Sequence, residues 1–354
     1  MDDNVNRILL VSNMYPSENE PAFGAFVKNI ASSLSENYIV DLVVIDKKSI
    51  GKLNKLINYL VFYFTVIKSL IINQFNFIYL HFASHSSIPV ILLTMLGMKF
   101  NIVTHIHGGD IKYLEGRSRI FFAIKKVVVK KILLVSTKII VPSKHYAEYL
   151  QDNYGSFNNI VIYPSGGVNV DVFKELPIPN KRNLIGYAGR LVKSKNVSFL
   201  IQALKRFPFL KLEIVGEGEE LANLKKLVEE LNISSQVSFL KGKSQKDLSE
   251  WFNQINCLVY PSSSESLGLV PIEAMACGTH VILSEIPAFM DLREAGFTFN
   301  TSRVADVISL EDSIKKIYDS SENELNLSIV HNKQLVSEIY SHKMVDKVLK
   351  NVFK

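Results

Sequence analysis

Short apolar runs alternate along the chain with longer stretches of helical periodicity. Within the runs, apolar and polar residues do not alternate, which is typical of strands buried on both faces of a parallel sheet. Helical patterns lie between the runs, as at 25–35 and 120–135. The strands predicted in the first half are 7–12, 38–45, 77–81, 100–105 and 138–141.

The same pattern restarts in the second half, after Pro177 and Pro179 interrupt any regular element. The strands and helices predicted there are, in chain order, 183–188, 197–207, 211–216, 219–231, 237–240, 245–254, 257–260 and 281–283. We therefore predict an α/β fold with two Rossmann-like, doubly wound parallel-sheet domains, at 1–176 and 177–335. Ligands of such sheets bind at the carboxyl ends of strands, so the expected site is a cleft that both domains face.

Composition and charge are those of a globular protein of two domains. The 354 residues are 47% hydrophobic and 21% charged. Residues 1–175 contain 18 Lys/Arg and 13 Asp/Glu, a net charge of +5. The remaining residues contain 22 and 21, a net charge of +1, so the excess of positive charge lies in the first half. Cys257 and Cys277 show no ligand spacing, so neither a disulfide framework nor a zinc site is indicated, and a reducing compartment fits.

No secretory signal or confident transmembrane helix is predicted. The N-terminus runs from a short polar segment directly into the first strand. The most apolar stretch, residues 56–80, is interrupted at Lys68 and by three polar residues at 73–76. We interpret it as a core helix followed by the strand that ends near residue 80.

In the second half, two motifs have the chemistry of an anion site. Arg190 and Lys195 lie in a loop between a strand and a helix, where cations and helix N–H groups can hold a diphosphate. Glu265 and Glu273 stand eight residues apart around a helix start. The alternatives are solvated surface cations, and a loop acid followed by a first-turn acid. Residues 216–221 lack the third glycine of a dinucleotide fingerprint and are interpreted as a strand-to-helix turn.

In the first half, His105 and His107 precede Gly108, Gly109 and Asp110 at the end of a strand, which indicates a catalytic loop. Metal binding is disfavoured because two histidines at a strand end are expected to point to opposite faces. Gly24 stands before the first helix, where a ligand can approach the backbone, although a plain loop glycine is the alternative.

Residues 117–138 form a basic, apolar helix without acids. This pattern indicates contact with an anionic membrane surface, with a solvated face on a packed helix as the alternative. Nucleic acid is not indicated as a partner, because no recognition motif accompanies the charge. The cations are Arg117, Arg119, Lys125, Lys126, Lys130, Lys131 and Lys138.

Taken together, these motifs resemble the retaining GT-B glycosyltransferases of family 4, known as glycosyl transferases group 1. The resemblance covers nearly the whole chain. Its specific part is the Gly-Arg-Leu loop with its lysine, followed by two glutamates separated by seven residues. The motifs, in order, are Gly24 in Pro-x-x-Gly-x-Phe-Val, His107 to Asp110, Ser165 to Asn169, Gly189 to Lys195, Val215 to Gly218, Phe239 to Gly242, and Pro261 to Gly278.

The resemblance implies a role for each site residue. Arg190 and Lys195 would hold the diphosphate of a nucleotide-sugar donor and stabilise the departing phosphate. Glu273 would bond the ribose hydroxyls, and Glu265 would face the transferred sugar. His107 would lie beside the reacting centre, and Gly24 would give room for the diphosphate. Backbone N–H groups that would contact sugar and phosphate belong to Ser266, Leu267, Gly268, Leu269 and Val270. No metal is expected, because cations and helix N-termini supply the charge.

The implied activity is a hexosyltransferase-type transfer, with retained anomeric configuration, from a nucleotide diphosphate-sugar to a lipid-linked glycan. It would serve bacterial surface polysaccharide or lipopolysaccharide assembly, in the cytoplasm and peripherally on the inner face of the membrane. The segment 336–354 would form a helix that crosses back to the first domain. A nucleotide-sugar 2-epimerase of the same fold and a non-catalytic nucleotide-sugar-binding protein are the alternatives. Four departures concern the donor's seating: Asn196 for glycine, Leu267 for phenylalanine, Ser165 for asparagine, and one glycine at Gly24.

Overall fold

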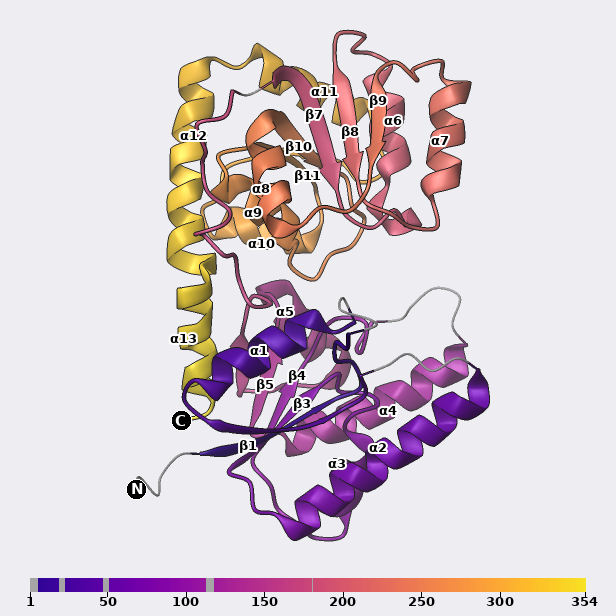
Figure 1. Ribbon diagram of the computed structural model, residues 1–354, viewed down its shortest axis with the longest axis vertical. Helices are drawn as coiled ribbons and strands as arrows, with labels where there is room; N and C mark the ends of the chain where they lie inside the picture. Colours follow the sequence, from indigo (N-terminus) through magenta and orange to yellow (C-terminus); the bar gives the residue numbers. More distant parts are fainter. Residues whose placement is uncertain (1–5, 19–22, 47–50, 113–117, 180) are drawn as a thin grey trace. The chain divides into compact units, whose positions relative to one another are not determined.

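The computed structural model describes residues 6–18, 23–46, 51–112, 118–179 and 181–354. Of the sequence motifs, Pro21 and Arg117 lie outside the described residues. The chain divides into two compact units: unit 1 is Met1–Gly166 with Val345–Lys354, and unit 2 is Gly167–Met344 (Figure 1).

The observed division corrects the predicted boundaries. It falls at 166/167 rather than 176/177, because Val168 and Phe173 already belong to the buried core of unit 2. The turn out of unit 1 uses three successive residues with positive φ at 165–167 (52°, 90° and 72°), two of them glycines. The segment that returns to unit 1 begins at Val345, not at 336, and it packs Leu349 and Phe353 into that core.

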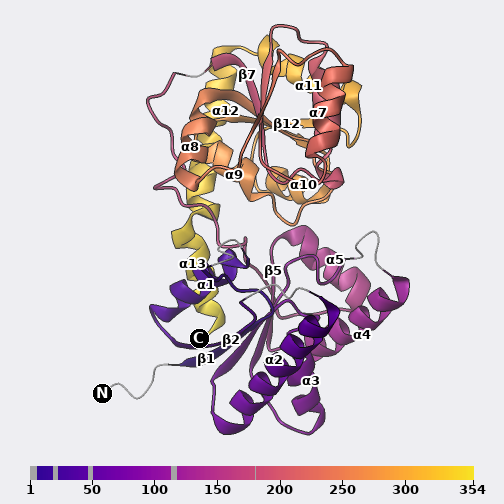
Figure 2. The same ribbon diagram turned by 45° about the vertical axis from the view of Figure 1, so that its right-hand side comes forward.

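Unit 1 is built on a six-stranded parallel sheet in the order β2-β1-β3-β4-β5-β6. One face is covered by α2, α3, α4 and α5, and the other by α1 and the returning α13 (Figure 2). The strands are β1 Arg7–Ser12, β2 Ile39–Val44, β3 Phe77–His81, β4 Ile102–His105, β5 Lys138–Val141 and β6 Ile160–Ile162. The helices are α1 Ala25–Ser35, α2 Lys52–Ile72, α3 Ile88–Met95, α4 Arg119–Val135, α5 Lys144–Tyr154 and α13 His342–Val352.

Unit 2 has a second six-stranded parallel sheet, in the order β12-β11-β10-β7-β8-β9. The strands are β7 Lys181–Ala188, β8 Lys211–Val215, β9 Val237–Leu240, β10 Ile255–Tyr260, β11 His280–Ser284 and β12 Asn300–Ser302. The helices are α6 Val197–Leu204, α7 Leu221–Glu230, α8 Gln245–Gln254, α9 Leu269–Ala276, α10 Pro287–Glu294, α11 Val307–Asp319 and α12 Glu322–Leu335. The two sheets confirm the predicted pair of Rossmann-like, doubly wound domains.

The prediction that residues 56–72 form a core helix is wrong in part. They do form a helix, α2, but only the stripe Phe62, Val66 and Leu70 is buried against the sheet. In the described part of the chain, α2 is also the one helix that is long and apolar enough, by length and composition, to cross a membrane.

Candidate active site

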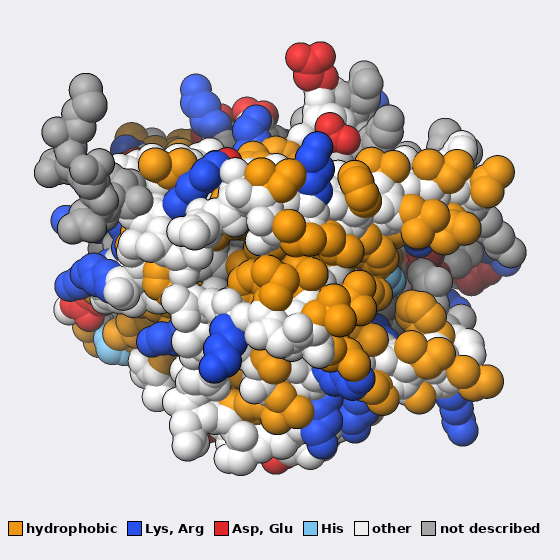
Figure 3. Space-filling model, turned by 90° about the horizontal axis from the view of Figure 1, so that it is seen from below, with side chains coloured by type: hydrophobic (Ala, Val, Ile, Leu, Met, Phe, Trp, Pro, Cys, Tyr) orange, Lys and Arg blue, Asp and Glu red, His pale blue; other side chains and the backbone are white. Residues whose placement is uncertain are grey.

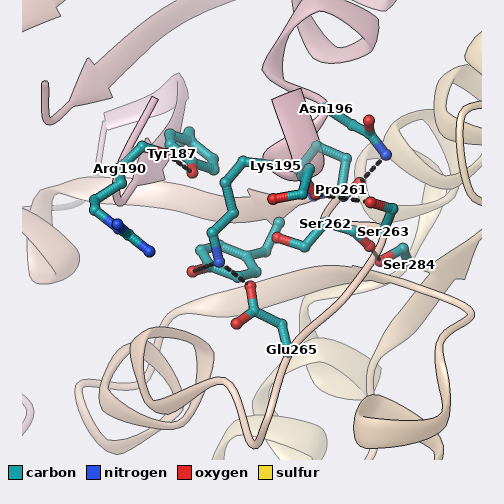
Figure 4. Close-up of polar contacts among 11 residues, drawn as sticks. Tyr187, Arg190, Lys195, Asn196, Pro261, Ser262, Ser263, Glu265 and Ser284 are labelled. Carbon is teal, nitrogen blue, oxygen red and sulfur yellow. Dashed lines mark hydrogen bonds and ion pairs between the residues drawn. The ribbon is translucent and has the colours of Figure 1, made fainter. Parts of the chain in front are cut away.

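In unit 2, the predicted anion-binding residues lie on two loops at the centre of the sheet. β7 and β10 are neighbours there, and the chain leaves them in opposite lateral directions toward β8 and β11. Loops at such a switch point are not covered by a crossover helix, so they form the usual ligand site of doubly wound sheets. The β7 loop carries Arg190 and Lys195, and the β10 loop carries Glu265 (Figure 4).

The two loops are bonded to each other near Asn196. Its side-chain amide donates to the carbonyl of Pro261 at 3.1 Å, and the N–H of Ser263 donates to the carbonyl of Ser194 at 2.8 Å (Figure 4). Asn196 has φ 54° and ψ 29°, the left-handed conformation that asparagine adopts more readily than most residues. Asn196 therefore adopts a backbone conformation that glycine adopts freely, and its side chain adds a bond between the loops.

Lys195 and Glu265 form an ion pair at the centre of this site. The Nζ of Lys195 donates to Oε1 of Glu265, and the two side chains are only 13% and 12% exposed. The same ammonium lies 5.3 Å from the ring centroid of Tyr260, a cation–π distance. Arg190 is exposed, and among the described residues it forms no ion pair. The sequence pairs Lys195 with Arg190 along one loop; the structure shows that its fixed partner is Glu265.

The glycines of residues 216–218 hold the Arg190 loop in place. A Cβ on Gly216 would lie 2.0 Å from the carbonyl oxygen of Gly189, and one on Gly218 would lie 2.2 Å from that of Leu191. The N–H of Leu191 donates to the carbonyl of Glu217 at 2.9 Å. These glycines therefore allow direct backbone contact between the two loops, which gives a structural reason for a motif that resembles a dinucleotide fingerprint.

Helix α9 presents its N-terminus and one acid to the site. Its N-cap is Gly268, with φ 84°, where a Cβ would lie 2.5 Å from the buried ring of Phe289. The N–H groups of the first turn have no partner within the helix, so the segment 266–270 can donate to an anion. Glu273 lies farther along α9, and burial raises its pKa to about 7.

In unit 1, three histidines lie together at the carboxyl ends of β3 and β4. Nδ1 of His81 and Nε2 of His107 are 3.0 Å apart, and their rings are nearly parallel, with an interplanar angle of 12°. The ring centroids of His105 and His107 are 4.2 Å apart. This corrects the expectation that His105 and His107 point to opposite faces, because side chains two residues apart in an extended segment lie on the same side.

Asp110 and Lys125 fix the loop that carries His107. The carboxylate of Asp110 accepts from the backbone N–H groups of His107 and Ala83, at 3.1 and 3.2 Å. Nζ of Lys125 donates to the carbonyl of Gly109 at 2.9 Å, from a side chain that is buried. Lys125, which lies on α4, therefore holds the His107 loop, and the prediction that it faces a membrane is wrong.

The sequence interpretation missed the aromatic contacts of His107. The ring centroids of Phe26 and Phe82 lie 4.9 and 4.6 Å from that of His107. Phe82 has φ 65°, an uncommon conformation for a bulky residue, directly after β3. Phe26 stands two residues after Gly24. A Cβ on Gly24 would lie 2.7 Å from the backbone of Met14, so close backbone packing itself requires glycine at this position. The sequence could have indicated both phenylalanines, because they follow β1 and β3, the two strands that flank the switch point of unit 1.

The three histidines have the residue types of a metal site, and two of them are hydrogen-bonded to each other. Their nearest ring nitrogens lie within 4.8 Å of one another. A metal needs unprotonated nitrogens aimed at one point. Here the His81 and His107 nitrogens are aimed at each other, and Nδ1 of His105 is 2.7 Å from the hydroxyl of Tyr79. The contacts fit a hydrogen-bonded network better than a metal centre, and a metal-free reaction stays a prediction.

We expect this cluster to make unit 1 unstable in mild acid. Burial lowers the pKa of His107 to about 3 and holds those of His81 and His105 well below the usual range. Below pH ~6.5 the histidines of the unfolded chain take up protons, whereas those of the folded cluster stay neutral. The free energy of unfolding therefore decreases as the pH is lowered, by up to ~1.4 kcal/mol per pH unit for each histidine. The midpoints of urea unfolding, measured from pH 7.5 to 5.5, test this expectation. If His81→Gln left the pH dependence of the midpoint unchanged, the histidine cluster would not be its cause.

Comparison with known proteins gives family matches to both units. The family described as "Glycosyl transferases group 1" matches residues 170–334, and "Glycosyltransferase Family 4" matches residues 21–171. A D-inositol 3-phosphate glycosyltransferase of Mycolicibacterium paratuberculosis is 33% identical over 140 residues. That match covers 36% of this chain and 31% of the relative, so it spans less than a third of the relative's length.

Solved structures resemble the whole chain. Sucrose-phosphate synthase from Thermosynechococcus elongatus has a TM-score of 0.80 at 19% identity, with 98% of each chain covered. HepE from Anabaena, in complex with UDP and glucose, has a TM-score of 0.76 at 17% identity and covers 98% of this chain and 99% of its own. At these identities, the likeness shows that the fold is shared.

Proposed function

The chain belongs to the GT-B glycosyltransferases of family 4, and we propose that it transfers a sugar from a nucleotide diphosphate-sugar to a glycan acceptor with retention of anomeric configuration. The observation that carries this proposal is the site at the switch point of unit 2. The β7 loop carries a nearly buried lysine, Lys195, and an exposed arginine, Arg190. The β10 loop next to it leads into the N-terminus of α9.

The donor diphosphate is assigned to Arg190, Lys195 and the first turn of α9. Lys195 is held by Glu265, which orients the ammonium without burying it fully. Two cations and free N–H groups can neutralise a diphosphate and stabilise the charge that develops on it as it leaves, which is the task of a metal in other transferases. Glu273 is assigned to the ribose hydroxyls, and Glu265 to the transferred sugar as well as to Lys195.

The transfer balances without an enzyme nucleophile. An acceptor hydroxyl oxygen forms a bond to the anomeric carbon on the face from which the diphosphate departs, and the bond from that carbon to the phosphate oxygen breaks. The hydroxyl proton passes to the departing phosphate, so the products are the glycoside and a nucleoside diphosphate. Burial keeps the imidazole of His107 neutral, since its pKa is lowered to about 3. We assign it a hydrogen bond to the sugar rather than a charge.

The acceptor is proposed to be a lipid-linked glycan of bacterial surface polysaccharide or lipopolysaccharide assembly. The support is the basic surface of α4 in unit 1, the unit that the resemblance assigns to the acceptor. Arg119, Lys130 and Lys131 are exposed there, beside exposed apolar side chains. Such a surface suits the anionic inner face of the cytoplasmic membrane, where lipid-linked substrates are held.

Donor affinity should depend on the ionisation of Glu273. With its pKa raised to about 7 by burial, the free protein holds a neutral carboxyl group in acid and a carboxylate above neutrality. Ribose hydroxyls donate to the carboxylate, so affinity should rise with pH and level off above ~8, with a loss approaching tenfold per pH unit below 7. Calorimetry with a nucleotide-sugar, whose diphosphate does not titrate in this range, measures the effect. Glu273→Gln should bind more weakly than the wild type above pH 8, where Glu273 is ionised, and show no such step.

The activity is tested by incubating the purified chain with a panel of nucleotide-sugars and candidate glycan acceptors, with excess chelator throughout. We expect one donor class to yield nucleoside diphosphate and a glycoside of the donor's anomeric configuration, observed by NMR. An inverted product would contradict retention, and turnover restored only by a divalent metal would contradict the metal-free reaction. Epimerised donor formed without acceptor would indicate the 2-epimerase instead.

A further inference from the structure

Helix α2 has an outward face that is apolar along its length. Its buried stripe, Phe62, Val66 and Leu70, follows a spacing of four residues and anchors the helix to the sheet. A surface helix normally carries polar residues opposite such a stripe. Here the exposed large apolar side chains, each 48–69% exposed, are Leu53, Leu56, Ile57, Leu60, Val61, Phe64, Ile71 and Ile72.

The apolar face continues from α2 onto its neighbours. α2 contacts α3, and α3 contacts α4, so the three helices form one layer of unit 1. Figure 3 shows hydrophobic side chains gathered over this side of the unit, with lysine and arginine side chains among them and around them. The exposed members on α3, at its C-cap Leu96, and on α4 are Ile88, Leu92, Met95, Leu96, Ile120, Phe121, Ile124, Val127, Leu134 and Val135. Single exposed apolar residues need no explanation, but a continuous patch of this kind marks a binding surface.

The charge of the same region is one-sided. Residues 47–147 contain 15 Lys/Arg and two acids, or +13, while the rest of the chain contains 25 and 32, or −7. Of the two acids, Asp110 is buried beneath the His107 loop, and Glu115 lies outside the described residues. The exposed cations on and beside the three helices are Lys55, Lys68, Lys99, Arg119, Lys130 and Lys131.

We propose that α2, α3 and α4 together form a membrane-docking surface, in which α2 lies in the plane of an anionic bilayer with its apolar face at the boundary of headgroups and acyl chains. The proposal deepens the proposed peripheral location, which assigned the contact to 117–138 alone. Apolar side chains supply insertion and the lysines supply attraction to anionic lipids, the two contributions that hold interfacial helices. The face that inserts is therefore mainly that of α2, whose cations are few.

Two other uses of this face are disfavoured by the same observations. A spanning α2 would have to withdraw Phe62, Val66 and Leu70 from the core of unit 1. A second copy of the chain would bring two surfaces of like charge together, with almost no acids to pair the cations. An anionic bilayer satisfies both the apolar side chains and the lysines.

The test is flotation of the full chain with vesicles of phosphatidylcholine alone or mixed with phosphatidylglycerol. Leu60→Asp with Phe64→Asp changes two exposed side chains one turn apart on α2. The matched control is Leu327→Asp with Val330→Asp, two exposed side chains on α12 of unit 2. We expect binding to the mixed vesicles only, a loss of at least ~10-fold in the α2 variant, and no change in the control. Nucleotide-sugar turnover with a water-soluble acceptor should be unaffected by the α2 variant, so failure of this proposal is distinguishable from failure of the transferase assignment.

Other outcomes would overturn the proposal. Absence of binding to mixed vesicles would exclude the docking surface. Binding lost in Lys130→Gln with Lys131→Gln but retained in the α2 variant would leave an electrostatic contact of α4 only. Resistance of the bound protein to extraction at high pH would indicate a spanning helix. Wild-type dimers that become monomers in the α2 variant, observed by sedimentation, would make the face a protein interface.

Discussion

Replacing Lys195 by alanine should lower kcat/KM for nucleotide-sugar turnover by a factor of at least ~100, the usual effect of removing one group that stabilises developing charge in a preorganised site. The ammonium is only 13% exposed and is held by Glu265, so little reorganisation is needed when a diphosphate binds. Its loss also leaves the carboxylate of Glu265 without its cation, which adds electrostatic repulsion toward the donor. Turnover and donor protection against thermal unfolding measure the two effects.

The control for Lys195→Ala is Lys193→Ala, an exposed lysine on the same short turn. It should change turnover little, because no described contact joins it to Glu265 or Tyr260. The double variant Lys195→Ala with Glu265→Ala removes the unpaired carboxylate. If that double variant regained wild-type turnover, Lys195 would act only by neutralising Glu265, and its assignment to the diphosphate would be wrong.

Replacing Gly218 by alanine should destabilise unit 2 and weaken donor binding together. The added Cβ would lie 2.2 Å from the carbonyl oxygen and 2.6 Å from the carbonyl carbon of Leu191, so the backbone of the Arg190 loop has to move. Overpacking against backbone costs at least ~2 kcal/mol. Urea unfolding gives the stability, and calorimetry with a nucleotide-sugar gives the affinity.

Gly242→Ala is the matched control, because nothing lies within 4 Å of a Cβ built there. We expect it to leave both stability and affinity within error of the wild type. Equal effects of the two alanines would mean that the contact between the loops of Gly218 and Leu191 does not position the cations.

Much of the fold follows from the sequence because parallel strands in doubly wound sheets are continuous apolar runs. The strands Arg7–Ser12, Phe77–His81 and Lys138–Val141 have the predicted bounds for this reason. β12 is a polar three-residue strand and gives no such run, and β6 is apolar but only three residues long. Helix α12 has no apolar stripe, so periodicity does not reveal it.

The site was less predictable, because its contacts join distant segments. His81 and His107 are 26 residues apart, and their bond depends on the pairing of β3 with β4, which a single sequence does not specify. Lys125 lies on the same helix as Lys130 and Lys131, yet its side chain is buried against the His107 loop while theirs are exposed. Helical spacing places a lysine on a face but does not say which loop meets that face.

The most direct test of the account is calorimetric titration of nucleoside diphosphates into the wild-type chain and into Arg190→Ala with Lys195→Ala, at a pH above 8 where Glu273 is ionised. We predict saturable binding of one nucleoside diphosphate by the wild type without added metal, and loss of that binding in the double variant while the fold is retained. Equal binding by the two proteins, or no binding of any nucleoside diphosphate by the wild type, would contradict it.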